Sequence, residues 1–159
     1  MSEPFRVKTT LEGWVCGVRG RVLERVVGEF HEFEGEIDPE PLRLWLHFEG
    51  ANPIRFFGAS DGWFLKGDGS APFEVDMGKE GKTKILDITG ERSWKPCVGS
   101  LVSGVNLLRS SESNLPFGLE LIFEPGHVMF ILNWGDEMWV SEGMPPDARP
   151  EEFVRSPVL

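Results

Sequence analysis

The sequence has no tyrosine and is poor in cysteine, histidine and basic residues. It holds two cysteines and three histidines, and 26 Asp and Glu outnumber 16 Lys and Arg, which gives a net charge of −10. Two thiols among 159 residues do not make a disulfide framework, and a protein this acidic repels the phosphates of nucleic acids. We therefore predict reduced cysteines and no nucleic-acid partner.

Long hydrophobic runs are also absent. No apolar stretch approaches the roughly 20 residues that a membrane-spanning helix needs. The first ten residues contain Glu3, Arg6 and Lys8 rather than the apolar core of a signal peptide. We expect a cytoplasmic protein without a membrane partner.

The sequence contains no catalytic, nucleotide or metal motif that is complete. Gly81-Lys82-Thr83 resembles the end of a phosphate-binding loop, but Asp76 stands where that loop begins with glycine. No histidine has metal-ligand spacing to a second histidine or a cysteine; the three are His31, His47 and His127. We predict no cofactor and no metal site, and we favour a non-enzymatic protein while leaving enzymatic activity open.

Glycine and proline are abundant, and the apolar residues follow a strand-like pattern. The 19 Gly and 12 Pro favour turns over long helices. In residues 42–48 every second side chain is Leu or Phe, with Arg43, Trp45 and His47 on the other face, which is the period of a half-buried strand. A second extended run covers residues 54–57, and Asp61-Gly62 predicts a tight turn before the next strand.

The same arrangement recurs 75 residues later. Residues 117–140 align with residues 42–65 without a gap, with matching turn positions. We predict one domain over residues 1–159 with an internal repeat, roughly residues 20–66 and 95–141. A polar joint at 67–94 and a C-terminal tail at 142–159 complete the chain.

The expected fold is mainly β, with two pseudo-repeated antiparallel meanders packed as a sandwich or partly closed barrel and with little helix. A short helix is expected from Pro146 toward Arg155, with Asp147 as its cap. Residues 101–109 fit either a helix or a strand.

The most acidic segment runs from Glu29 to Glu40 and contains no Lys or Arg. On a single strand, alternation would place four carboxylates on one face as a ladder; they are Glu32, Glu34, Glu36 and Asp38. Such a ladder would attract a basic protein partner. An edge strand protected by charge, or a cation site, are the alternatives.

The two aligned turns carry further candidates. Asp61 and Asp136 occupy equivalent positions, and Trp134 and Glu137 lie beside the second. An exposed tryptophan at a turn is typical of recognition surfaces, so we add Trp134, Asp136 and Glu137 to the predicted partner-binding residues. Ordinary turn chemistry explains an Asp at these positions equally well.

The second meander is apolar on both faces around Ile122, Phe130 and Leu132. A strand of this kind is covered twice, either by its own chain or by a partner. Cover by the N-terminal segment or the C-terminal tail is one expectation, and a homodimer through these three residues is the other.

The function that these patterns favour is a non-enzymatic acidic binding protein, such as an inhibitor or immunity-type partner of a basic protein. This expectation rests on charge and size and on no motif. Two alternatives stay open: a small-ligand-binding β-barrel, and an enzyme that uses the turn carboxylates Asp61, Asp136 or Glu137.

Overall fold

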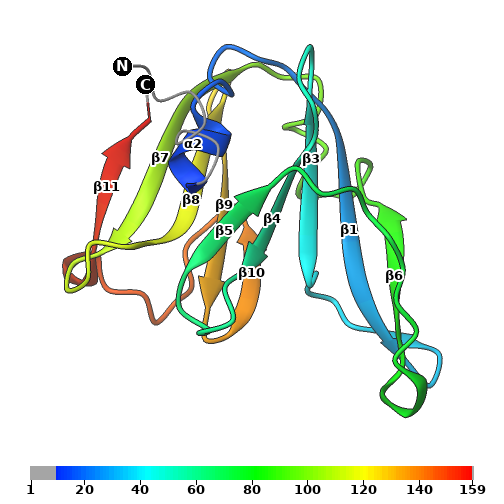
Figure 1. Cartoon of the computed structure of the whole chain (residues 1–159). Helices are drawn as coiled ribbons and strands as arrows, with labels where there is room; N and C mark the ends of the chain where they lie inside the picture. The colour runs from blue at the N-terminus through cyan, green and yellow to red at the C-terminus, as the bar shows by residue number, and fades with distance from the viewer. Residues whose placement is uncertain (1–9, 159) are drawn as a thin grey trace, which may run out of the picture.

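The computed structural model describes residues 10–158 as two antiparallel β-sheets packed against each other and not closed into a barrel (Figure 1). The first sheet contains β1 (Leu23–Phe33), β2 (Glu36–Ile37), β3 (Arg43–Phe48), β4 (Ile54–Gly58), β5 (Leu65–Asp68) and β6 (Lys82–Asp87). The second contains β7 (Val102–Ser110), β8 (Pro116–Phe123), β9 (His127–Trp134), β10 (Glu137–Ser141) and β11 (Phe153–Pro157). The helical elements are α2 (Leu11–Val15), η1 (Gly78–Glu80) and η2 (Pro150–Glu152).

The two sheets share one strand order. In the first sheet, β1, β3, β4 and β5 form a meander, and β6 returns to pair with the outer side of β1. In the second sheet, β7 to β10 form a meander, and β11 returns to pair with β7. The prediction of two related antiparallel meanders with little helix is therefore confirmed, and the sandwich is the form that they take.

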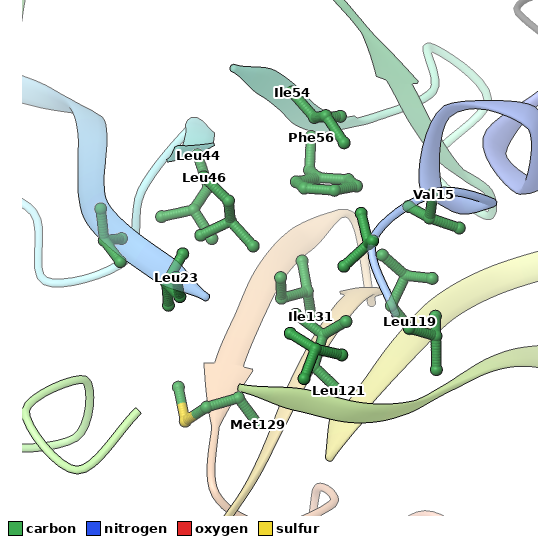
Figure 2. Close-up of a cluster of buried hydrophobic side chains, with 14 of the residues drawn as sticks. Val15, Leu23, Leu44, Leu46, Ile54, Phe56, Leu119, Leu121, Met129 and Ile131 are labelled. Carbon is green, nitrogen blue, oxygen red and sulfur yellow. The ribbon is translucent and has the colours of Figure 1, made fainter. Parts of the chain in front are cut away.

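The core lies between the sheets and is built by the alternation seen in the sequence. Figure 2 shows apolar side chains of β3 and β4 on one side of the core and those of β8 and β9 on the other. Each fully buried Leu or Phe contributes about 1.5–3 kcal/mol through the hydrophobic effect. The core also includes Leu11 and Val15 of α2, whose N-terminus is capped by the Thr10 hydroxyl, which accepts a hydrogen bond from Gly13 N.

At three places the secondary structure differs from the sequence-based prediction or decides between its alternatives. The helix predicted between Pro146 and Arg155 is wrong, because residues 153–157 form β11 and pair with β7. Long-range pairing overrides the local helix signal there. Residues 102–110 are a strand, which settles the ambiguity at 101–109. Trp63 and Phe64 belong to the turn before β5 rather than to the strand itself.

The carboxylate ladder on a single strand is also wrong. The chain reverses at Glu34 and Gly35, whose φ angles of 52° and 81° are those of a tight hairpin turn. The pairing of Glu32 with Ile37, and of Phe33 with Glu36, puts Glu32 and Glu36 on opposite faces. Gly35 was the local turn signal in this segment, and the alternation of acidic residues concealed it.

The outer face of the second sheet is covered by its own chain. Phe130 is 6% exposed and Leu132 is fully buried, and Met144 and Phe153 from the C-terminal segment pack against this cluster. Ile122 is half-buried. Cover by the tail is thus what the structure shows, and a homodimer through these residues stays a prediction.

The two cysteines are not bonded to each other. Cys16 is exposed and Cys97 is buried in the core. Burial, with a smaller contribution from the charge of Glu142, raises the pKa of Cys97 to about 11. The Cys97 thiol is therefore protonated at neutral pH and acts as a small apolar core group.

Candidate functional site

The two aligned turns meet at one end of the sandwich. The β4–β5 turn and the β9–β10 turn lie side by side at the lower centre of Figure 1, and Asn133 Nδ2 donates a 2.8 Å hydrogen bond to the Phe64 carbonyl. A Cβ atom placed on Gly62 would lie 3.0 Å from Asp136 Oδ1, so the turns are in contact. Gly62 has a φ of 79°, which suits glycine and permits this close approach.

A cleft of about 220 Å³ opens beside these turns, at the mouth between the two sheets. One wall comes from the segment that leads into β3 and from the end of β4, and the other comes from the β9–β10 turn. The lining residues are Asp38, Glu40, Pro41, Leu42, Gly58, Ala59, Asn133, Asp136, Glu137 and Met138. Segments about 95 residues apart in the sequence therefore form one site.

The cleft carries four carboxylates and no cationic side chain among its described lining residues. Asp38 lies 3.5 Å from His31 Nδ1, and His31 Nε2 lies 2.6 Å from the Glu80 carbonyl oxygen. His31 thus ties Asp38 to the loop that precedes β6. Within residues 10–158, the carboxylates of Asp136 and Glu137 make no ion pair.

Apolar side chains make up part of the cleft lining. Pro41, Ala59 and Met138 are buried, and Leu42 is partly exposed. A lining with both apolar and acidic side chains suits a long side chain that has an aliphatic stem and a charged tip. A volume of about 220 Å³ is below the roughly 300–1,000 Å³ of typical small-molecule pockets, so the cleft fits a side chain better than a whole small ligand.

The structure brings together three of the seven predicted partner-binding residues. Asp38, Asp136 and Glu137 line the cleft. Glu32 instead forms a 3.4 Å ion pair with Lys82, and the exposed Glu34 and Glu36 belong to the hairpin and not to the lining. The predicted grouping of all four acids of the segment is therefore not what the fold produces.

Trp134 is directed into packing rather than outward as a turn-tip contact. Its indole Nε1 donates to Asp147 Oδ1 at 3.2 Å, and its ring lies 5.9 Å from that of Phe117. It joins the cluster on the outer face of the second sheet. A partner-binding role for Trp134 stays a prediction.

Asp61 has the structural role of an ordinary turn residue. Its Oδ1 accepts hydrogen bonds from the backbone N–H groups of Trp63 at 2.9 Å and Phe64 at 3.4 Å. Asp61 does not line the cleft, whereas its aligned counterpart Asp136 does. The two carboxylates therefore do not form one paired site.

Three cleft residues were not predicted from the sequence: Glu40, Leu42 and Asn133. Asn133 carried a usable signal, because it follows Met129 and Ile131 on the core-facing side of β9 and interrupts their apolar pattern. A polar residue on a core-facing row is unusual unless it is hydrogen-bonded or functional. Glu40 and Leu42 gave no such signal, since they enter the site only through the course of the chain before β3.

A second cavity, of about 720 Å³, is lined by residues between 14 and 24 and by residues from Phe48 to Ile54 around the β3–β4 turn. In residues 10–158, no group of three or more His, Cys, Asp or Glu side chains is arranged to hold a metal ion. None of the helices in the same range is long and apolar enough to cross a membrane. No protein-family model, curated protein or solved structure matches this chain.

Proposed function

We propose that this is a non-enzymatic acidic binding protein whose cleft receives a basic segment of a partner protein, in the manner of an inhibitor or immunity protein. The observation that carries the proposal is the convergence of four carboxylates from two distant segments on one mouth of the sandwich; they are Asp38, Glu40, Asp136 and Glu137. With no cation among the described lining residues, a basic side chain from outside would supply the missing countercharge.

The net charge of −10 supports the same proposal at longer range. A strongly negative protein steers a basic partner toward it and accelerates association at low ionic strength. Because screening acts over about 10 Å at 0.1 M salt, association of this kind weakens as salt is added.

The test compares two variants with the same change in total charge. Asp38→Lys with Asp136→Lys reverses two cleft carboxylates, and Glu34→Lys with Glu36→Lys reverses two exposed hairpin carboxylates outside the cleft. Each variant and the wild-type protein is immobilised and exposed to extract of the native cell at low and at high ionic strength. Captured basic proteins are then purified, and their binding to each form is measured.

A basic protein that the wild type and the hairpin variant retain at low salt, and that the cleft variant loses, would support the proposal. Equal loss in both variants would indicate attraction by total charge and would contradict a role for the cleft. Retention by all three forms, or the absence of any salt-sensitive basic partner, would also contradict it.

A further inference from the structure

Asn133 is a buried amide in the wall of the acidic cleft. It is 4% exposed, lines the cleft and contacts Gly58, where an added Cβ would lie 2.9 Å from its Nδ2 and 3.3 Å from its Oδ1. The hydrogen bond from Nδ2 to the Phe64 carbonyl fixes which end of the amide is the oxygen. In residues 10–158, no group donates a hydrogen bond to Asn133 Oδ1.

An amide oxygen without a protein donor takes its hydrogen from water or from a bound group. No buried side-chain atom of the described residues is both sealed from solvent and unpaired. Asn133 Oδ1 is therefore reachable, and as a residue of the lining it presents an acceptor to the cleft. This neutral acceptor is an observation separate from the four carboxylates at the rim.

We infer that the group the cleft receives is the guanidinium of an arginine side chain, with Asn133 Oδ1 and the rim carboxylates as its acceptors. The inference rests on the proposed function and names the chemistry of the partner's docking residue. Carboxylates alone attract lysine and arginine alike, so the discrimination comes from the need to satisfy several acceptors at once.

The guanidinium of arginine and the ammonium of lysine differ in how many hydrogen bonds they donate and in which directions. A guanidinium presents five N–H donors in a rigid planar fork, which can bond an amide oxygen and a carboxylate together. An ammonium is a compact, strongly hydrated charge with three donors. The buried or partly exposed apolar side chains of Pro41, Leu42 and Met138 offer contacts for the aliphatic stem behind the fork.

The experiment uses two synthetic nonapeptides of identical sequence, with arginine at three positions in one and lysine in the other. Binding of each peptide to the full-length protein is measured by titration calorimetry at low and moderate salt. We expect the arginine peptide to bind about tenfold more tightly, because the lysine peptide leaves the Asn133 acceptor poorly satisfied. The preference should persist at moderate salt, since it does not arise from net charge.

Two variants locate the preference without removing a carboxylate. Asn133→Leu deletes the acceptor, and Gly58→Ala places a methyl group against the Asn133 amide, so that one variant remains usable if the other fails to fold. Thermal unfolding establishes which variants are folded. In a folded variant the arginine preference should fall to about twofold or less, while salt-sensitive binding of both peptides remains.

The outcomes separate the inference from the proposed function. Equal, salt-sensitive binding of the two wild-type peptides would overturn the arginine inference and leave the acidic docking site standing. An arginine preference that survives in a folded variant would overturn the role of Asn133. Failure of both peptides to bind at low salt would overturn the inference and the proposed function together.

Discussion

The outer faces of the two sheets are built on the same topology and differ in chemistry. In each sheet, the chain leaves the last strand of the meander and crosses over to a strand that pairs with the first strand of that sheet. The first crossover is residues 69–81, between β5 and β6, and the second is residues 142–152, between β10 and β11. Each accepts an indole hydrogen bond: Trp45 Nε1 donates to the Ser70 carbonyl at 2.7 Å, and Trp139 Nε1 donates to the Gly143 carbonyl at 2.8 Å.

Beyond that shared bond, the two crossovers diverge. The second carries Met144 and leads to Phe153, and both pack onto the apolar outer face of its sheet. The first carries Phe73, which is 63% exposed and covers little. The second crossover therefore adds its own apolar side chains to the outer face of its sheet, whereas the first contacts the buried Trp45 through Ser70.

On the outer face of the first sheet, charged side chains form ion pairs with each other. Arg55 donates to Asp68 through Nε at 2.8 Å, and its guanidinium also lies 4.6 Å from the centre of the Phe57 ring. Arg43 pairs with the buried Glu29 at 2.9 Å. Charged groups on a sheet need water or partners, and here paired charges take the place of the apolar cluster that packs on the outer face of the second sheet.

The largest effect is expected from placing one charge at equivalent positions. Leu132 is fully buried, whereas its aligned counterpart Phe57 is half-buried between Arg43 and Lys66. Leu132→Asp should lower the free energy of unfolding by about 4 kcal/mol or more, because the carboxylate is buried without a partner. Phe57→Asp should lower it by only about 1 kcal/mol, since cations flank it. Urea denaturation measures the free energy of unfolding of both variants. Similar losses in the two variants would show that the outer faces of the two sheets tolerate a charge equally well.

The shared indole bonds give an intermediate effect. Trp45 is 1% exposed and Trp139 is half-buried. Trp45→Phe should cost about 2 kcal/mol, from the lost hydrogen bond and the space left behind, and Trp139→Phe about 1 kcal/mol. Thermal or urea unfolding would show this order. Trp63→Phe is the control, because this side chain is 72% exposed and its replacement should change stability little. A larger loss of stability in Trp139→Phe than in Trp45→Phe would mean that the indole bond to the second crossover contributes more than the bond to the first.

The smallest effect concerns pH and is specific to the first face. Burial acts to raise the pKa of Asp68, but hydrogen bonds from Arg55 and Ser70 outweigh it and hold this pKa below its ordinary value. A lowered folded-state pKa adds stability above the unfolded value of about 3.9, and this stability is lost as pH falls through the folded pKa.

Asp68→Asn should remove that contribution, which we expect to be about 1 kcal/mol given the partial exposure of the pair. Unfolding by urea at pH 6 and at pH 2.5 provides the measurement. The wild type should lose more stability than the variant on acidification, and equal losses would exclude Asp68 as a source of acid sensitivity.

The local pattern of the sequence was sufficient for the framework of the fold. Alternation over residues 42–48 predicted β3, and the recurrence at residues 117–140 predicted the second hairpin and the relation of the two sheets. Period-two patterning is local, because one face of each strand must be buried whatever lies opposite it. The acidic hairpin shows where prediction from alternation fails. The acidic residues do alternate along the segment, but a two-residue turn at Glu34 and Gly35 places them on two strands instead of one.

The cleft depended on information that no local pattern contains. Asp38 and Asp136 share a site only because the sheets pack face to face and bring the chain before β3 to the end of β9. The strand at residues 153–157 likewise forms through pairing with β7, against a local preference for helix. Composition and periodicity determined that this acidic chain makes two antiparallel meanders. Tertiary packing alone decided which carboxylates converge, because contacts between distant segments depend on how buried faces fit together and not on the order of neighbouring residues.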